Sequence, residues 1–263
     1  MISVALPCLP SAFSAYEPWH RHFLQTCGAR RSLPWEEPER LTAAERRLVA
    51  RSIQQFQLGE WARGRGLMRR ASAQPVFAND PWWLPALGLF IAEEQEHSSI
   101  LGRYLDREGI QRLETHWLDG IFRRLRKLAG LELCATVLVT AETLAIPFYQ
   151  ALRDATHSPL LRAICVRILC DEATHLKFQA LTLGLIRRPL GRRAGAIRSF
   201  GHALLFHGTA LLLWQQHHRV FQAAGWDFRC FWNEAQREFA RLERQIRQAS
   251  SDDLDSRDQQ RLD

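Results

Sequence analysis

Apolar residues recur every three to four positions along most of this 263-residue chain. That period gives an α-helix one continuous apolar face, so it predicts helices whose buried faces meet in a common core. The pattern predicts four core helices and two further ones, over residues 42–70, 81–108, 132–154, 159–188, 194–224 and 227–249. The strict alternation typical of a half-buried strand is missing, and the chain is therefore predicted to be all-α.

Short signals mark where these helices begin and end. Residues 42–45 read Thr-Ala-Ala-Glu, a capping box in which the two outer side chains each accept a hydrogen bond from the other residue's backbone. The run 79–81, Asn-Asp-Pro, and the pair Ser158 and Pro159 predict two more helix starts, because proline is tolerated in a first turn. Gly109 is expected to end the second core helix.

The chain is predicted to form one large helical domain with additions at both ends. Residues 1–40 contain five prolines and scattered aromatic residues, which favours an extended N-terminal arm packed on the body. Residues 41–190 are predicted to form a four-helix bundle whose two halves are joined by a long crossover at 110–130. Residues 191–249 would add two flanking C-terminal helices, and the polar residues 250–263 are expected to be a disordered tail.

Composition narrows the function classes. Hydrophobic residues make up 46% and charged residues 24% of the chain, which is an ordinary globular balance. The net charge of +7 would suit an acidic partner, but the arginine clusters lie at predicted helix ends and lack the basic and aromatic alternation of a nucleic-acid module. We therefore expect no nucleic-acid partner. The charge permits a peripheral membrane contact, which we do not favour.

Cysteine usage and the apolar segments indicate a cytoplasmic protein. The six cysteines include no Cys-x-x-Cys pair, so they are expected to be reduced thiols rather than zinc or rubredoxin ligands. The N-terminal residues lack the basic start of a signal peptide. The longest apolar run, Ala203–Trp214, is too short to span a bilayer and is expected to be a buried helix.

Two Glu-x-x-His pairs, Glu94 with His97 and Glu172 with His175, stand inside otherwise apolar helical faces. About one helix before each pair, a single glutamate lies on an apolar face of its own. The six candidate metal ligands are, in chain order, Glu60, Glu94, His97, Glu142, Glu172 and His175. Residues three apart on a helix share one side, so each pair can serve one metal position, with the single glutamates closing the site.

The burial predicted for these carboxylates is the reason to expect a metal. Several carboxylates buried together without cations would be very unfavourable, and two divalent or trivalent ions would remove that cost. Carboxylate and imidazole ligands without thiolate favour iron, with manganese as the alternative, over a structural zinc. The competing interpretation is that each pair is a helix ion pair and that Glu60 and Glu142 lie at the surface.

The order of these ligands resembles that of the ferritin-like di-iron carboxylate superfamily, over residues 42–188. The resemblance implies a four-helix bundle that holds two iron ions, with Glu94 and Glu172 as bridging carboxylates. It also implies that the acid before each Glu-x-x-His pair accepts a hydrogen bond from the ligand histidine of the opposite pair. The two hydrogen bonds predicted in this way are Asp171 with His97 and Glu93 with His175.

Departures from the superfamily's patterns narrow the activity. Leu101 stands where the tyrosyl-radical reductase subunits would carry a tyrosine, and the missing cysteine pairs argue against a rubrerythrin. The resemblance therefore implies a di-iron, or iron and manganese, oxidoreductase that activates dioxygen to oxidise or hydroxylate a small organic or acyl substrate. Because the chain has no nucleotide-binding glycine motif, it would need an external electron donor such as a ferredoxin or a reductase.

Two other function classes stay open. A ferroxidase or iron-storage ferritin uses the same ligand set, although such subunits are shorter than this chain, and a non-catalytic helical scaffold would bind no metal. The oligomeric state is also open, with a homodimer as one option. A second histidine-rich region has no accompanying acid and is expected to serve packing or surface roles. It comprises His202, His207, His217 and His218.

Overall fold

The computed structural model describes residues 14–29, 32–60, 64–114 and 130–251. Throughout these residues the chain forms helices and their connections without any strand, so the prediction of an all-α fold is confirmed. Most of the expected C-terminal tail and most of the expected crossover lie outside the described residues, and the first two residues expected in the tail, 250 and 251, belong to the last helix.

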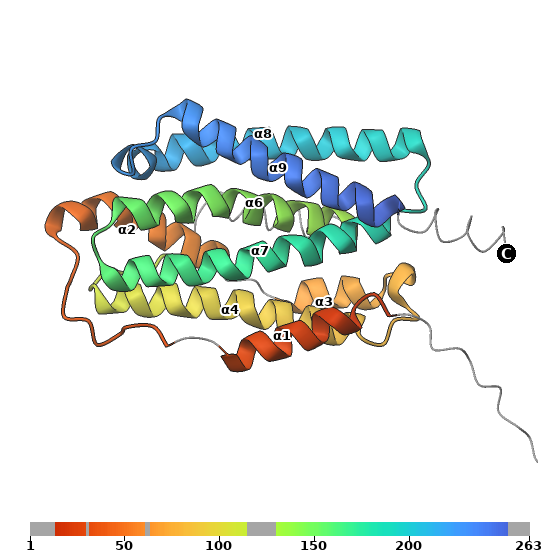
Figure 1. The fold of residues 1–263 in the computed structure, drawn as a ribbon, viewed down its shortest axis with the longest axis horizontal. Helices are drawn as coiled ribbons and strands as arrows, with labels where there is room; N and C mark the ends of the chain where they lie inside the picture. The colour runs from red at the N-terminus through yellow and green to blue at the C-terminus, as the bar shows by residue number, and fades with distance from the viewer. Residues whose placement is uncertain (1–13, 30–31, 61–63, 115–129, 252–263) are drawn as a thin grey trace, which may run out of the picture.

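Four long helices form the centre of the fold, in the order that the sequence predicts. They are α2 (Ala43–Glu60), α4 (Trp83–Arg107), α6 (Leu131–Ala155) and α7 (Pro159–Arg187). α2 packs along α4 and α6 packs along α7, while α4 and α7 also contact each other (Figure 1). Because α4 and α7 carry the two Glu-x-x-His pairs, their contact is what positions the candidate site.

Several helix ends follow the predicted signals. At the start of α2, the Glu45 amide donates to Thr42 Oγ1 at 3.2 Å and the Thr42 amide donates to a Glu45 carboxylate oxygen at 3.0 Å, so the capping box is present. The Ser158 side chain caps α7 by accepting a hydrogen bond from the Leu161 amide at 3.3 Å. Gly109 follows α4 with a φ of +64°, a left-handed conformation that glycine adopts without strain.

Helix α4 begins later than the sequence predicted. Its first residue is Trp83, and the preceding Trp82 makes no side-chain cap. The expected cap, Asp80, accepts a hydrogen bond from the Trp82 amide at 3.0 Å, and it also accepts from the Ser14 hydroxyl at 2.6 Å and the Tyr16 amide at 3.2 Å. The carboxylate therefore holds the N-terminal part of the chain against the approach to α4.

The N-terminal arm is partly helical, which corrects the extended arm expected for residues 1–40. Helix α1 spans Glu17–Ala29. Pro18 does not prevent this helix, because it lies in the first turn, where a missing amide proton leaves no helical hydrogen bond unmade. Tyr16 and Phe23 are buried against aromatic side chains of α4 and α7, and α1 lies along α4 at the lower edge of Figure 1.

The first predicted core helix, expected to run unbroken over residues 42–70, is described in two parts. α2 ends at Glu60 and α3 covers Gly64–Ser72, with residues 61–63 outside the described part. A short 3-10 helix, η1 (Pro75–Phe77), leads from α3 towards α4. The side chain of Glu60 also lies outside the described part, so its expected place in the core is not tested.

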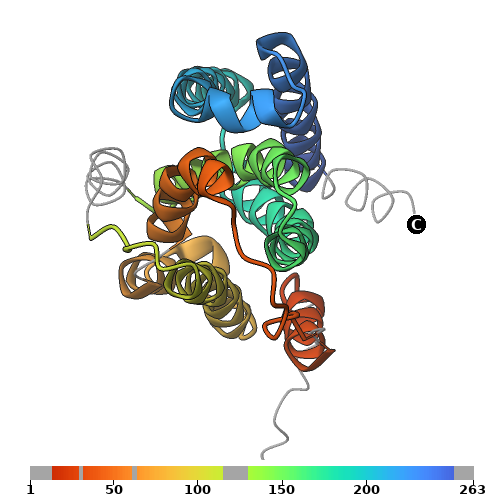
Figure 2. The same ribbon diagram turned by 90° about the vertical axis from the view of Figure 1, so that its left-hand side faces the viewer.

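Two C-terminal helices, α8 (Arg192–Ala223) and α9 (Phe228–Ser251), cover α6 and α7, close to their predicted limits. Figure 2 shows them as a separate layer beside the bundle. The chain reverses between them at Gly225, whose φ is +81°. α9 approaches α7 closely at Gly184, where an added Cβ would lie 2.5 Å from that of Ala249. Glycine at this position therefore allows the last helix to lie directly on α7.

By length and composition alone, α6 is the one described helix that is long and apolar enough to cross a membrane. In this fold 78% of its apolar stretch is buried, and α7 and α8 both pack against it. Burial between neighbouring helices accounts for an apolar composition of this kind.

Candidate metal centre

The two Glu-x-x-His pairs meet between α4 and α7. α4 carries Glu94 and His97, α7 carries Glu172 and His175, and one potential ligand atom from each residue lies within 4.8 Å of the others. All four side chains are buried, because each pair lies in an apolar face and the two faces are turned towards each other. The structure thus brings together four of the six residues that the sequence suggested as metal ligands.

Each carboxylate of this group borders both imidazole rings. Glu94 Oε1 lies 2.8 Å from His175 Nδ1 and 3.9 Å from His97 Nδ1. Glu172 places one oxygen 3.8 Å from His97 Nδ1 and the other 3.9 Å from His175 Nδ1. Each glutamate therefore lies near both histidines. Two cations that shared both carboxylates would require this arrangement.

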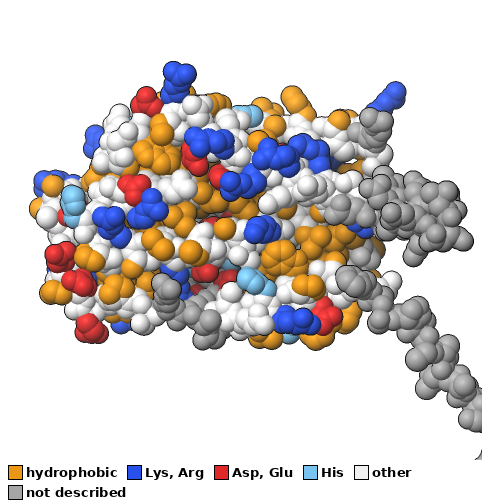
Figure 3. Space-filling view, viewed as in Figure 1, with side chains coloured by type: hydrophobic (Ala, Val, Ile, Leu, Met, Phe, Trp, Pro, Cys, Tyr) orange, Lys and Arg blue, Asp and Glu red, His pale blue; other side chains and the backbone are white. Residues whose placement is uncertain are grey.

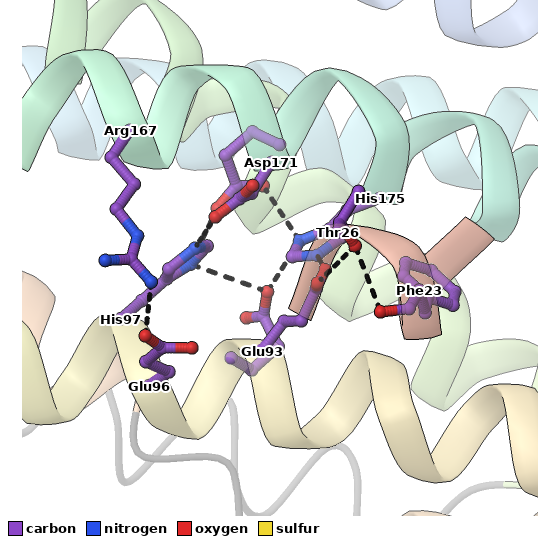
Figure 4. A network of polar contacts seen from close by, with 10 residues as sticks. Phe23, Thr26, Glu93, Glu96, His97, Arg167, Asp171 and His175 are labelled. Carbon is purple, nitrogen blue, oxygen red and sulfur yellow. Dashed lines mark hydrogen bonds and ion pairs between the residues drawn. The ribbon is translucent and has the colours of Figure 1, made fainter. Parts of the chain in front are cut away.

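The outer nitrogen of each histidine is held by an acid from the opposite helix (Figure 4). His97 Nε2 lies 2.9 Å from Asp171 Oδ2, and His175 Nε2 lies 3.0 Å from Glu93 Oε2. These are the two crossed hydrogen bonds that the sequence predicts. When the acids are ionised, each Nε2 carries a proton and donates it to its acid, which leaves Nδ1 of each ring as the nitrogen available to a cation beside the shared carboxylates.

The concentration of charge changes the protonation of groups in the site. Burial alone would lower the pKa of His175, but its hydrogen bonds to Glu93 and Glu94, together with the charge of Glu172, raise that pKa well above its usual value. Burial raises the pKa of Glu142 well above the ordinary range, and the nearby charge of Glu94 raises it further. Without a cation the cluster therefore holds protons, which bound metal ions would replace.

The residues present fit a metal ion. The group comprises two carboxylates and two imidazoles with no thiolate, a combination that suits iron and manganese. Nδ1 of His97 is buried and makes no hydrogen bond to any residue in the described part of the chain. A buried polar atom in that position is unfavourable, and a cation bound to its lone pair would satisfy it.

The other two predicted ligands, Glu142 and Glu60, differ in what the structure shows of them. Glu142 on α6 is buried, but it lies outside the group of four and accepts a hydrogen bond from Gln179 of α7. The charges of Glu94 and His175 nevertheless act on its pKa, so it stands beside the candidate centre. The role of Glu60 stays a prediction, because its side chain is not among those described.

Helix α1 contributes contacts that the sequence did not predict. Thr26 Oγ1 donates to Glu93 Oε1 at 3.0 Å, so Glu93 is bonded both to α1 and to His175 (Figure 4). The rings of Phe23 and Phe90 pack beside the His175 ring, with centroids 6.2 Å and 4.9 Å away. This side of the centre is therefore covered by apolar rings.

The other side of the centre is covered differently. The side chain of Asp171, which holds His97, is 16% exposed, compared with 6% for Glu93. Next to it, Arg167 of α7 forms an ion pair with Glu96 of α4 (Figure 4). A partly exposed ion pair between α7 and α4 therefore covers the His97 side, whereas α1 covers the His175 side.

Comparisons with known proteins give the chain no family. No family model, no curated protein and no solved structure matches it. The resemblance to the ferritin-like superfamily therefore stays a prediction, and function has to be argued from the side chains of the site.

Histidines of α8 have partners within the fold. His202 Nδ1 lies 2.8 Å from Glu243 Oε1 of α9, and His217 Nδ1 lies 2.8 Å from Ser52 Oγ of α2. All four residues are buried, so these contacts tie α8 to its neighbours, in keeping with a packing role. The sequence did not predict an acid beside His202, because the two residues lie 41 positions apart.

Proposed function

We propose that this protein is an oxidoreductase that holds two iron ions, or one iron and one manganese, between α4 and α7 and uses dioxygen to oxidise or hydroxylate a small organic or acyl substrate. The crossed pairing of histidines and acids supports this most strongly. Each Nδ1 faces carboxylates common to both rings, while each Nε2 is bonded to the opposite helix. Two separate helix ion pairs would need no such partners across the interface.

The chain's own residues divide into ligands and residues that orient the ligands. In this proposal His97 and His175 would hold the metal ions through Nδ1, together with the carboxylates of Glu94 and Glu172 that border both rings. The proton held on each Nε2 fixes the ring tautomer and makes Nδ1 the better ligand atom. The remaining roles are terminal carboxylates for Glu60 and Glu142, and the orienting acids Asp171 and Glu93.

Apolar side chains on part of the site's boundary suit an oxidation. Phe23 and Phe90 cover one side, and Ala145 and Ile146 are buried in the turn of α6 that follows Glu142. When bound, the metal pair would supply the electrons that reduce dioxygen. Walls that exclude water direct the resulting oxidising equivalent to a substrate rather than to solvent.

Repeated turnover requires electrons from outside the chain. The sequence has no nucleotide-binding glycine motif, so the proposal includes a ferredoxin or reductase as partner. A cytoplasmic location would provide such donors. It also agrees with the free thiols of the described cysteines, which are Cys134, Cys165, Cys170 and Cys230.

A ferroxidase or iron-handling protein is the second candidate, because the same ligands would bind and oxidise ferrous iron. In that case iron is the substrate and leaves the site as ferric mineral or passes to a partner. The oxidoreductase instead keeps its metal ions and consumes an organic compound. The two candidates therefore differ in how much iron accumulates and in whether an electron donor sustains oxygen consumption.

Anaerobic loading followed by oxygen separates the two. Metal-free protein would be titrated with ferrous iron, the bound iron counted by elemental analysis, and oxygen then admitted with a reduced ferredoxin. The oxidoreductase predicts saturation at about two irons per chain and oxygen consumption that depends on the donor. Uptake far beyond that ratio, without donor-dependent oxygen consumption, would favour iron handling. A protein that binds no metal would overturn both candidates.

A further inference from the structure

The outer face of α8 exposes large apolar side chains. Ile197, Phe200, Leu204 and Leu211 are 70%, 73%, 67% and 51% exposed. Figure 3 shows hydrophobic side chains reaching the surface at the edge of the molecule that α8 forms. Over residues 199–218 this helix contains no Asp, Glu, Lys or Arg. A contiguous apolar face of this kind on a folded chain marks a surface that another molecule covers.

The spacing along this face is that of a helix that packs on another helix. Ile197, Gly201, Leu204, Gly208 and Leu211, which we call the α8 stripe, follow one another at intervals of four and three residues. A repeat averaging 3.5 residues keeps one seam in contact with a partner helix along its length. Both glycines have open space above them, because an added Cβ would meet no atom within 4 Å. Large and small residues therefore alternate along the stripe.

This stripe is complementary to itself when two copies run antiparallel. With a two-fold axis level with Phe206, Leu204 lies opposite Gly208 of the second copy, since each is two residues from the axis. Leu211 lies opposite Gly201 of the second copy, since each is five residues from the axis. Every leucine then fills the open space above a glycine, and the symmetry makes each contact twice.

We propose that the α8 stripe is the surface on which a second copy of this chain binds, forming a two-fold dimer. The stripe with its flanks, residues 193–219, is roughly 40 Å long, and a helix with side chains is about 10 to 12 Å across. Two such strips bury roughly 1,000 Å² in total, which is near the lower limit for a biological interface. The dimer is therefore expected to be weak, with a dissociation constant on the order of micromolar.

A lipid surface is the competing occupant of this face. It would accept the same aliphatic side chains and Phe200, and Arg193 and Arg198 would lie near acidic headgroups. A lipid surface does not account, however, for the open space above Gly201 and Gly208, because larger apolar residues at these positions would bind a membrane more strongly. The alternation of large and small residues therefore favours the second copy.

The variant Gly208→Leu distinguishes the two occupants. Within one chain the new side chain has open space, and leucine favours a helix more than glycine does, so the fold should persist. In the dimer it would compete for the space filled by Leu204 of the second copy, twice by symmetry. Sedimentation velocity between about 1 and about 200 μM should show wild-type protein passing from monomer to dimer, with the dissociation constant raised about tenfold or more by Gly208→Leu.

Gly195→Leu is the matched control, because Gly195 lies on the same helix outside the stripe and also has open space above it. It should dimerise as the wild type does. Wild-type protein that stays monomeric throughout, or an equal loss of dimer in both variants, would overturn the proposal.

Flotation with vesicles of phosphatidylcholine and phosphatidylglycerol provides the second measurement. Wild-type flotation that strengthens in Gly208→Leu would overturn it in favour of lipid, whereas absence of flotation would support the dimer.

Discussion

His97 and His175 hold equivalent places in their Glu-x-x-His pairs, but their surroundings are unequal. The acid that holds His175, Glu93, has a side chain only 6% exposed and accepts a second hydrogen bond from Thr26. The acid that holds His97, Asp171, has a side chain 16% exposed. One histidine is therefore fixed beneath α1, whereas the other is held by an acid that solvent reaches.

If the proposed pair of metal ions is bound, this difference predicts unequal roles for the two positions. A ligand whose partner is buried and doubly bonded keeps its orientation, so the position at His175 is expected to bind its ion more tightly. The position at His97, which lies beside a partly exposed acid, is expected to exchange its ion more readily. Its cover, the ion pair of Arg167 with Glu96, is polar, whereas α1 gives the other side an apolar cover.

The largest effect on metal binding is expected at the carboxylate that borders both histidines. Glu172→Ala removes a carboxylate that borders both histidines, so metal should be lost from both positions rather than from one. Elemental analysis after dialysis against iron measures the loss. Glu238→Ala on α9 is the control, since burial also raises the pKa of that glutamate and it should load fully. Retention of half the metal by Glu172→Ala would contradict a shared carboxylate.

The second largest effect is expected on stability, when each histidine is replaced by alanine and the two variants are compared. His175→Ala removes a partner of Glu93, which is buried, whereas His97→Ala removes a partner of Asp171, which water reaches. Loss of a partner costs about 3 kcal/mol for a buried charge and roughly 1 kcal/mol for a partly exposed one. Urea unfolding of the metal-free proteins should therefore show the larger loss of stability for His175→Ala. Equal losses would mean that the two sides are equally enclosed.

A smaller effect tests the contact from α1. Thr26→Val keeps the shape of the side chain but removes the hydroxyl that donates to Glu93. Loss of a hydrogen bond that orients a ligand's partner should weaken metal binding by about tenfold, at one of the two positions only. Competition with a chelator measures this affinity. Thr26→Ser keeps the hydroxyl and should bind as the wild type does, and equal weakening in both variants would assign the effect to the packing of α1.

The smallest effect is expected at the polar cover beside His97. Arg167→Gln breaks the ion pair with Glu96, whose side chain is 37% exposed, so stability should fall by no more than about 1 kcal/mol. The amount of bound iron should not change, but a chelator should remove it faster, as followed by stopped-flow absorbance. Arg153→Gln breaks the surface pair with Asp154 and makes the same charge change as a control. An unchanged removal rate in Arg167→Gln would show that ions leave by another side.

The core of the site was predictable because its spacing is local. Glu94 with His97, and Glu172 with His175, lie three residues apart on helices with apolar faces, so the shared side follows from the helix period. The two crossed hydrogen bonds of the histidines are present as well. How closely Glu142 approaches depends on the rotation of α6 against its neighbours, which no local pattern determines.

The sequence around helix α1 carries two conflicting signals, the prolines of residues 1–40 and a helical apolar spacing. Five prolines within residues 1–40 favour an extended chain, but Pro18 occupies the one turn of a helix that tolerates it. The aromatic residues Tyr16, Trp19 and Phe23 follow one another at intervals of three and four, which is the signal of a helical face. That spacing is the feature of the sequence that indicates a helix here.

Other errors come from contacts between distant parts of the chain. Asp80 has the sequence context of a helix cap and accepts from the Trp82 amide, but its further bonds to Ser14 and Tyr16 could not be expected from the local sequence. His202 has no acid near it in sequence, yet Glu243 lies beside it once α9 folds back along α8. Pairings of this kind depend on tertiary structure, so they are set by the packing of helices rather than by local preference.

The first and last described helices, α1 and α9, both contact α7, and this bears on the order in which the site is enclosed during synthesis. α1 places Phe23 beside His175, while α9 packs Leu242 and Ile246 against α7 from another side. Because α9 follows α7 in the chain, α7 leaves the ribosome before α9 can cover that side. A chain that terminated before Phe228 would present bare apolar surface to chaperones and proteases in place of an enclosed site.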